Sequence, residues 1–377
     1  MVMHMKKILF LIHDLHHGGA EKVLVNLVNN MDPTKFEIHV TALFGGGVNE
    51  QFLKPHVRFR TIFPKSFPGN SHIMKLLTPR QLHRLCIKEH YDIEVSYLEG
   101  PCARIISGCT DPTTKKVCWI HVQQNTRKCA AASFRSYREA LACYNSFDRI
   151  VCVSDAVRKD FLGLLPVNVP TDVRYNTNES AQILASSADP VEAGLFSGSE
   201  IKLVGVGKLM PNKGFQRIIP IVKKLRDTGC PAHLYILGVG PMEAELKRMA
   251  AELGIEDAVT MLGYQTNPYK YVAKCDLFVC ASYAEGFSTA ATEALIVGTP
   301  VCTVEVSGMK EMLGSNNEWG IVTENDENAL YEGIKRLLDD PALLEHYKKQ
   351  AAERGKTFST ENTVRAVRDM LLETERY

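Results

Sequence analysis

Short apolar runs separated by helical patterns recur along the whole of this 377-residue chain. Most of the runs are rich in Val, Ile and Leu, as expected for strands of a parallel sheet that is covered on both faces. The runs that we predict as strands form two series, at residues 6–12, 36–43, 91–97, 115–121, 148–154 and 172–176, and at residues 201–207, 232–238, 258–263, 276–282, 300–304 and 320–323.

Helical spacing of apolar residues follows many of these strands. The helices that we predict lie at about residues 20–31, 215–229, 242–254, after Ser288, and at 327–338, 342–355 and 360–375. Residues 177–200 are small, polar and acidic, so we interpret them as a linker. Two strand–helix series joined by a linker predict an α/β protein with two doubly wound, Rossmann-like domains, 1–176 and 201–358. Ligands of such sheets bind beyond the carboxyl ends of the strands, so we expect the domains to face each other across a shared cleft.

Composition excludes several classes of protein. No apolar run approaches the roughly 20 residues of a membrane-spanning helix. The apolar start of the chain is followed at once by His13 and Asp14, without a small-residue cleavage site, and therefore reads as a buried strand and not a signal peptide. The eleven cysteines include no C-x-x-C pair and no Cys/His spacing typical of zinc sites. These features predict a protein of the reducing cytoplasm.

Charge is distributed unevenly along the chain. Residues 1–180 contain 23 Lys and Arg against 16 Asp and Glu, whereas the remainder contains 21 against 27. Much of the basic excess lies in residues 54–88, where apolar side chains are interleaved with eight Lys and Arg. Such a segment either lies on an anionic membrane surface or packs on its own domain as a solvated loop and helix. Because the overall charge is only +1 and no binding motif is present, nucleic acid is not expected as a partner.

Two acids in the segment 281–301, ASYAEGFSTAATEALIVGTPV, give the strongest chemical signal. Glu285 lies in a predicted turn between a strand and a helix, and Glu293 follows about two helical turns later. The start of a helix offers unpaired N–H groups that suit a phosphate. The acids could then hold a sugar hydroxyl and a ribose diol on either side of the phosphates. Alternatively, Glu285 stabilises the helix start and Glu293 is a surface acid.

Three further groups follow predicted strands. Gly18 and Gly19 precede a helix and would let the backbone approach a phosphate or sugar, although a tight turn would also explain them. Lys208 and Lys213 lie in VGKLMPNKG, where two ammonium groups suit a pyrophosphate, unless they are solvated loop lysines. His121 ends the strand 115–121 and is a catalytic candidate or a structural histidine.

These segments together resemble glycosyltransferase family 4, the retaining transferases that use sugar nucleotides and have the GT-B architecture. The resemblance rests on GGAEKVLVNL, VGVGKLMPNKG, LYILGVGPMEAELKRMAAELG, MLGY and AEGFSTAATEALIVGTPV, in this order. It covers nearly the whole chain and is strongest over residues 201–323. It implies that the closing helix, in residues 359–377, returns to the first domain.

The resemblance also implies roles for individual residues. Glu285 would contact hydroxyls of the donor sugar, and Glu293 the ribose. Lys208, at a position where Arg is commoner, and Lys213 would hold the diphosphate, and His121 would lie near the sugar ring. The other residues expected around the donor are Gly18, Gly19, Gly238, Gly240, Gly263, Tyr264, Gly286, Phe287, Ser288, Thr289 and Ala290.

The implied reaction is transfer of a sugar from a nucleoside diphosphate, for which we expect UDP, to a saccharide or polyprenyl-linked saccharide with retention of configuration. The growing negative charge of the leaving phosphate would be stabilised by Lys208, Lys213 and backbone N–H groups of 287–290. No D-x-D segment is convincing, so neither a metal ion nor a cofactor beyond the sugar nucleotide is expected. The basic segment 54–88 would place the enzyme peripherally on the cytoplasmic face of a membrane, in cell-surface polysaccharide or glycolipid assembly.

Two other kinds of protein have this fold and bind a diphosphate in the same way. One is a sugar-nucleotide epimerase or hydrolase, and the other is a nucleotide-binding partner subunit without turnover. The presence of Glu285, Glu293, Lys208, Lys213 and His121 argues against loss of turnover. A dehydrogenase is disfavoured because Gly18 and Gly19 lack the G-x-G-x-x-G spacing.

Overall fold

Two parallel β-sheets organise the chain in the computed structural model, which describes residues 5–16 and 18–374, the side chain of Ser71 excepted. Each sheet belongs to its own unit. Unit 1 comprises the chain up to Asn178 together with the residues from Thr360 onward, and unit 2 comprises Glu179–Ser359. The prediction of an α/β protein with two doubly wound parallel sheets is confirmed.

The sheet of unit 1 has the strand order β3-β2-β1-β4-β5-β6-β7. Its strands are β1 Lys6–Ile12, β2 Phe36–Phe44, β3 Val57–Phe63, β4 Ile93–Ser96, β5 Lys115–Ile120, β6 Arg149–Cys152 and β7 Thr171–Val173. The order reverses between β1 and β4, since β1 pairs with β2 on one side and with β4 on the other. This reversal is the place where doubly wound sheets bind ligands, beyond the carboxyl ends of the strands.

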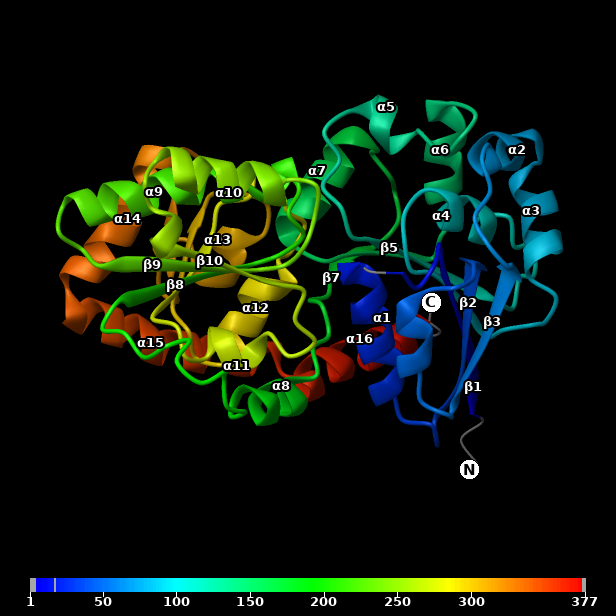
Figure 1. Cartoon of the computed structure of the whole chain (residues 1–377). Coiled ribbons are helices and arrows are strands. Elements are labelled where there is room, and N and C mark those ends of the chain that lie inside the picture. Colours follow the sequence, from blue (N-terminus) through cyan, green and yellow to red (C-terminus); the bar gives the residue numbers. More distant parts are fainter. Residues whose placement is uncertain (1–4, 17, 375–377) are drawn as a thin grey trace. The chain divides into compact units, whose positions relative to one another are not determined.

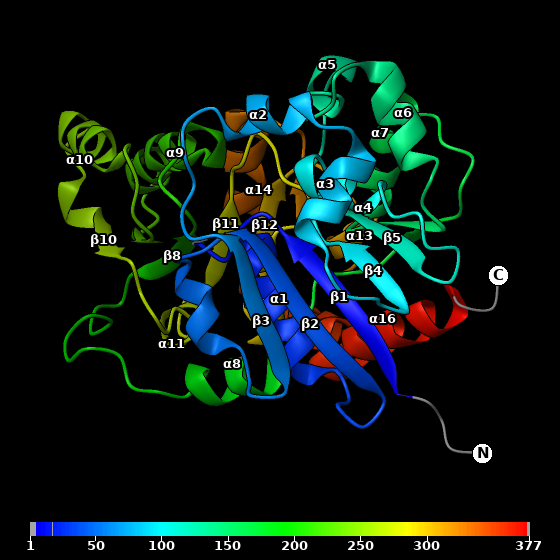
Figure 2. The same ribbon diagram turned by 90° about the vertical axis from the view of Figure 1, so that its right-hand side faces the viewer.

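Helices cover both faces of this sheet (Figure 2). They are α1 Gly19–Asn30, α2 Asn70–Leu76, α3 Pro79–Cys86, α4 Pro101–Ile106, α5 Arg127–Ala130, α6 Tyr137–Tyr144, α7 Asp155–Leu164 and α16 Thr360–Thr374, with a 3₁₀ turn η1 at Val48–Phe52. Helix α4 packs on β4, α3 and α6, whereas α1 packs against α16. Hydrogen bonds that hold the final helix in unit 1 include those from Thr360 Oγ1 to the Asn178 carbonyl at 2.6 Å and from Arg174 Nε to the Ala366 carbonyl at 3.1 Å.

Unit 2 repeats the arrangement with the strand order β10-β9-β8-β11-β12-β13. Its strands are β8 Ile201–Val206, β9 Ala232–Leu237, β10 Val259–Gly263, β11 Leu277–Cys280, β12 Val301–Val304 and β13 Ile321–Thr323. The order reverses between β8 and β11, which pair in parallel. Every residue of β9, β11 and β12 is buried, as expected for parallel strands between two helical layers.

The helical layers of unit 2 lie on opposite faces of its sheet (Figure 1). One layer contains α9 Phe215–Asp227, α10 Glu243–Glu252 and α14 Glu327–Asp339, and the other contains α8 Ser180–Ser187, α11 Tyr269–Val272, α12 Thr289–Ile296 and α15 Pro341–Gly355. The remaining elements are α13 Met309–Leu313 and the 3₁₀ turns η2 Pro211–Lys213, η3 Glu256–Ala258 and η4 Lys356–Phe358.

Two segments differ from the sequence-based expectation. Residues 57–63, expected within a basic loop and helix, form the edge strand β3 beside β2. Arg58 and Arg60 alternate there with Val57 and Phe59, a pattern that an edge strand tolerates. In the stretch interpreted as a linker, residues 177–200, the chain forms α8, which packs on α11 and α12. No helix within the described residues is long and apolar enough to cross a membrane.

Candidate active site

The point where the strand order of unit 2 reverses brings together the loops that follow β8 and β11. The first loop runs from Gly207 through η2 to Gly214, and the second runs from Ala281 to Ser288. Because β8 and β11 are neighbouring parallel strands, both loops leave the same edge of the sheet. Segments about 70 residues apart in the chain therefore form one local site.

An ion pair joins these two loops. Lys213 Nζ lies 2.7 Å from Glu285 Oε1, and Ser282 Oγ donates a hydrogen bond of 2.7 Å to the same oxygen. The side chain of Glu285 is 11% exposed and that of Lys213 is 29% exposed, so the pair is shielded from solvent more than an ordinary surface pair. Two of the residues selected from the sequence are thus in direct contact. Ser282 was not selected, although it occupies the end of the strand predicted over 276–282.

Hydrogen bonds to backbone carbonyls connect the two loops and tie the second loop to the start of α9. The Tyr283 N–H donates to the Asn212 carbonyl at 2.8 Å, and Arg217 donates to the Ala281 carbonyl at 3.1 Å. Gly214 adopts the left-handed conformation, φ +71°, and a Cβ at this position would lie 1.9 Å from the carbonyl oxygen of Ala281. Only glycine allows the loop of Lys213 to approach the loop of Glu285 this closely.

We expect Gly214→Ala to destabilise unit 2 by more than backbone strain alone. A non-glycine residue at positive φ costs about 1–3 kcal/mol, and here the Cβ also collides with Ala281. Gly254→Ala is the matched control, since φ is +64° and no atom lies within 4 Å of the added Cβ. Urea unfolding of both variants should show the larger loss for Gly214→Ala. Equal losses would mean that the loop moves aside without cost.

Lys208 lies at the start of the first loop, directly after Gly207, and is exposed. The neighbouring residue Leu209 is buried, and its N–H donates to the Val239 carbonyl at 3.0 Å. The backbone on the carboxyl side of Lys208 is therefore anchored to the loop after β9, while the lysine side chain remains accessible at the carboxyl edge of the sheet.

Helix α12 begins at Thr289, and Ser288 caps it by accepting a hydrogen bond of 3.3 Å from the Ala291 N–H. The first N–H groups of the helix and its positive dipole end lie beside the Glu285 turn, as the sequence predicted for 286–290. Glu293 is 9% exposed, and its Oε1 accepts a hydrogen bond of 3.2 Å from the Tyr269 hydroxyl. Glu293 is therefore not an ordinary surface acid. Tyr269 was missed, since no motif distinguishes it.

The predicted glycines after β9 and at the end of β10 also contact backbone. Gly238, at φ +147°, donates its N–H to the Gly263 carbonyl at 2.8 Å. A Cβ on Gly240 would lie 2.5 Å from the Leu209 carbonyl oxygen. Gly263 has φ +67°, and Tyr264 beside it is 62% exposed. Packing of the loop backbones explains Gly238 and Gly240 without a ligand, so their proposed contact with a nucleoside stays a prediction.

In unit 1, Gly18 and Gly19 follow β1 at the start of α1. Gly18 is extended, with φ −155°, a conformation that any residue adopts. A Cβ on Gly18 would meet only the mobile end of the Glu21 side chain, at 1.8 Å. The structure therefore gives no backbone reason for glycine at position 18, and the predicted approach of a phosphate or sugar stays a prediction.

His121 follows β5 and is 8% exposed. Its ring packs on the ring of Tyr97, with the centroids 4.8 Å apart, and its Nε2 is buried without a hydrogen-bond partner among the described residues. Burial lowers the pKa of His121 to about 3, so the imidazole is neutral. A buried polar atom without a partner is costly unless a ligand satisfies it, which favours a binding role for this ring.

Glu99 is an acid beside His121 that the sequence analysis did not select. It follows β4 by three residues, and its Oε2 accepts a hydrogen bond of 3.0 Å from the backbone N–H of His121. Burial raises the pKa of Glu99, against the effect of backbone N–H donors. Glu99 thus fixes the backbone that carries the imidazole. An acid directly beyond the end of a buried strand was the signal that could have identified it.

The neutral state of His121 predicts a pH-dependent stability. Its folded pKa of about 3 lies below the ordinary value of 6.5, so the unfolded chain binds this proton first. The contribution is fully present above pH 6.5 and is lost as the pH falls toward 3, by at most about 1.4 kcal/mol per pH unit. The free energy of unfolding, measured with urea between about pH 7 and pH 4.5, should therefore change less with pH for His121→Asn than for the unaltered protein. If the unfolding free energies of the two proteins change equally with pH, His121 protonates in the folded state over this range.

Comparisons with known proteins agree with this fold. Residues 17–177 match the family model "Glycosyltransferase Family 4", and residues 191–354 match the model "Glycosyl transferases group 1". The chain therefore belongs to the family-4 glycosyltransferases of GT-B fold, and the resemblance seen in its motifs is confirmed.

One curated relative spans nearly the whole chain. It is the N-acetylgalactosamine-N,N'-diacetylbacillosaminyl-diphospho-undecaprenol 4-alpha-N-acetylgalactosaminyltransferase of Campylobacter jejuni, with 28% identity over 97% of this chain and 99% of the relative. Among solved structures, Anabaena HepE in complex with UDP superposes with a TM-score of 0.78 at 18% identity, covering 97% of this chain and all of HepE. A glycosyltransferase of Rickettsia africae superposes with a TM-score of 0.78 at 14% identity, covering 98% of this chain and 99% of its own.

Proposed function

We propose that this glycosyltransferase transfers a hexose from UDP to a lipid-linked saccharide, with retention of configuration and without a metal ion. The observation that carries the proposal is the Lys213–Glu285 pair beside the start of α12. A cation, an oriented carboxylate and unpaired N–H groups at one place suit a diphosphate joined to a sugar.

The residues of unit 2 would divide the donor between them. Lys208, Lys213 and the first N–H groups of α12 would bind the diphosphate, whose negative charge grows as the bond to the sugar breaks. Glu285, oriented by Lys213 and Ser282, would accept hydrogen bonds from sugar hydroxyls. Glu293, oriented by Tyr269, would bind the ribose diol.

The bond changes need no side-chain base. The electron pair of the breaking bond leaves with the diphosphate, and the acceptor hydroxyl attacks the oxocarbenium-like carbon from the face that the leaving group vacates. A phosphate oxygen of the leaving group takes the hydroxyl proton. In unit 1, the Nε2 atom of the neutral His121 has no hydrogen-bond partner among the described residues. We propose that this atom forms a hydrogen bond with a sugar hydroxyl, as donor or as acceptor.

The choice of UDP is supported by HepE, which was crystallised with UDP. The test is a thermal-shift panel of UDP-, GDP- and ADP-sugars, followed by reactions with and without a lipid-linked saccharide. A ligand at about 100 times its dissociation constant adds roughly 2.7 kcal/mol to stability. We expect stabilisation by a UDP-sugar, and a product whose anomeric configuration, measured by NMR, equals that of the donor. Rapid donor consumption without any acceptor would identify an epimerase or hydrolase instead.

A lipid-linked acceptor is supported by the curated relative, whose name includes a diphospho-undecaprenol substrate. It is also supported by the basic segment, where α2 and α3 expose apolar side chains: Ile73 is 51% exposed, Leu76 77% and Leu85 56%. Lys65, Arg80, Arg84 and Lys88 are exposed in the same segment. We propose that this part of unit 1 lies on an anionic membrane.

Two arginines hold α2 in place. Arg104 donates to the carbonyls of Met74 and Leu77, at 2.8 and 2.7 Å, and Arg135 donates to those of Lys75 and Leu76, both at 2.6 Å. The last carbonyls of α2 are thereby satisfied, while the side chains of Ile73 and Leu76 are exposed. Exposed apolar side chains flanked by cations are the composition of a membrane-surface contact.

Liposome co-sedimentation tests this contact. Each Lys or Arg near an anionic surface contributes about 1 kcal/mol, so replacing Lys65, Arg80, Arg84 and Lys88 with Gln should release the protein from anionic vesicles. The matched control replaces four exposed cations of unit 2, namely Lys247, Arg248, Lys348 and Lys349, and should leave sedimentation unchanged. Unaltered protein that stays in the supernatant would favour a soluble acceptor.

A further inference from the structure

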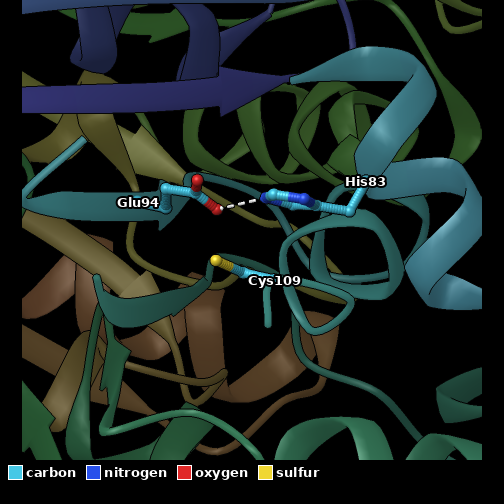
Figure 3. A group of neighbouring side chains, drawn as sticks. All are labelled: His83, Glu94 and Cys109. Atoms are coloured by element: carbon cyan, nitrogen blue, oxygen red, sulfur yellow. Dashed lines mark hydrogen bonds and ion pairs between the residues drawn. The ribbon is translucent and has the colours of Figure 1, made fainter. Parts of the chain in front are cut away.

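A carboxylate, an imidazole and a thiol from three elements meet inside unit 1 (Figure 3). Glu94 belongs to the central strand β4 and is 2% exposed. His83 belongs to α3, and Cys109, which is 8% exposed, follows the end of α4 by three residues. None of the three has a role in the transfer reaction proposed above.

The three side chains converge on one point. His83 Nε2 and Glu94 Oε2 are 2.8 Å apart, and the three donor atoms, including Cys109 Sγ, all lie within 4.8 Å of one another. Figure 3 shows the ring and the thiol both directed toward the carboxylate. The backbone of Cys109 is itself fixed, because its N–H donates to the Ile106 carbonyl at 3.0 Å.

The position of Glu94 demands a positive partner. Strand β4 lies between β1 and β5, where Glu94 pairs in register with Leu9 and Lys116. A carboxylate buried in such a sheet is costly unless it is paired. The imidazole of His83, whose Nε2 lies 2.8 Å from Glu94 Oε2, is the partner that the fold supplies.

We propose that His83, Glu94 and Cys109 form a Zn²⁺ site that ties α3 and the turn after α4 to β4. Nitrogen, oxygen and sulfur are the three donor types that zinc takes from proteins, and three protein ligands leave one position for water. A thiolate with an imidazole favours zinc over the hard cations Mg²⁺ and Ca²⁺. If His83 and Glu94 formed only an ion pair, that pair would give no reason for the thiol of Cys109 to lie beside both side chains.

Zinc binding requires a thiolate and a neutral imidazole, so the ligands give up their protons as the metal enters. A carboxylate, a thiolate and Zn²⁺ together carry no net charge, which suits a buried site.

Cobalt substitution tests the site in the full-length, untagged chain. Metal-free protein titrated with Co²⁺ should develop a near-ultraviolet thiolate-to-cobalt charge-transfer band that saturates at one Co²⁺ per chain and disappears when Zn²⁺ is added. Cys109→Ser should lose the band. His83→Gln, which keeps an N–H donor for Glu94, should bind Co²⁺ about 100-fold more weakly or worse, since even outer-shell changes cost 10–100-fold.

Cys129→Ser is the control, because Cys129 is the exposed cysteine of the chain and the thiol most open to adventitious metal. It should leave the band and its stoichiometry unchanged. Zn²⁺ should also raise the melting temperature of the unaltered protein and of Cys129→Ser, but not of Cys109→Ser. Absence of the band, or its survival in folded Cys109→Ser and His83→Gln, would overturn the site and leave the triad as a buried ion pair.

Discussion

Replacing Lys213 with Ala should lower turnover by about 10² or more, as loss of one preorganised charge stabiliser does in other enzymes. The ammonium group lies 2.7 Å from Glu285 and would face the leaving diphosphate, where negative charge grows during the reaction. The fold should persist, because Lys213 is 29% exposed and Glu285 keeps its hydrogen bond from Ser282. Lys208→Ala should change turnover in the same direction.

The matched control for Lys213→Ala is Lys223→Ala. Lys223 lies on α9 in the same unit, is partly exposed and is also paired with an acid, Asp227. Loss of an exposed pair of this kind should change stability by less than about 1 kcal/mol and leave turnover unaltered. Steady-state rates with saturating donor are the measurement. Near-normal rates for Lys213→Ala and Lys208→Ala together would refute the diphosphate assignment.

Calorimetry with free UDP should separate the two acids. Glu293→Ala should weaken UDP binding about tenfold or more, since a hydrogen bond to a charged group contributes roughly 1.5–3 kcal/mol. Tyr269→Phe removes only the hydroxyl that orients Glu293, and should weaken UDP binding in the same direction by a smaller factor. Melting temperatures of both variants show whether the loss is one of binding or of folding.

Glu285→Ala should leave UDP affinity intact or slightly tighter, because removing the carboxylate frees Lys213 for the phosphates. Transfer should nevertheless fall, because Glu285 is assigned to sugar hydroxyls that free UDP lacks. Glu285→Gln keeps the size of the side chain and separates the loss of charge from the loss of contact. If Glu285→Ala weakens UDP binding and Glu293→Ala spares it, the roles of the two acids are exchanged.

The strands of both sheets were predictable wherever they are buried on both faces. The run KKILFLI forms β1, and the run AHLYILG contains β9. An uninterrupted apolar strand must bury both of its faces, and a position between two helical layers does this. β3 was not predicted because Arg58 and Arg60 interrupt its apolar pattern. An edge strand tolerates such charged residues on alternate positions. Residues 180–187 formed α8 because Ile183 is buried in unit 2, a contact that composition does not reveal.

Residue types at the strand ends predicted which side chains would be candidates for the site. Lys213 and Glu285 were identifiable because each lies in a loop after a buried strand, next to glycine and before a helix. Their contact was not, because it depends on β8 and β11 being neighbours, a pairing between strands some 70 residues apart. Ser282 and Tyr269 orient other groups and belong to no recognisable motif, whereas Glu99 could have been selected as an acid beyond the end of a buried strand.

The sequence by itself determined the class of fold, the family and the polar residues at the carboxyl ends of the strands, because hydrophobic periodicity and local turn chemistry are properties of short segments. Only the tertiary structure decided which of these residues touch. It paired Lys213 with Glu285 and left His121 Nε2 without a partner among the described residues. It also brought one ligand atom each of His83, Glu94 and Cys109 within 4.8 Å of one another, although their spacing matches no metal motif. Such contacts join distant segments through strand order and helix packing, which local patterns do not encode.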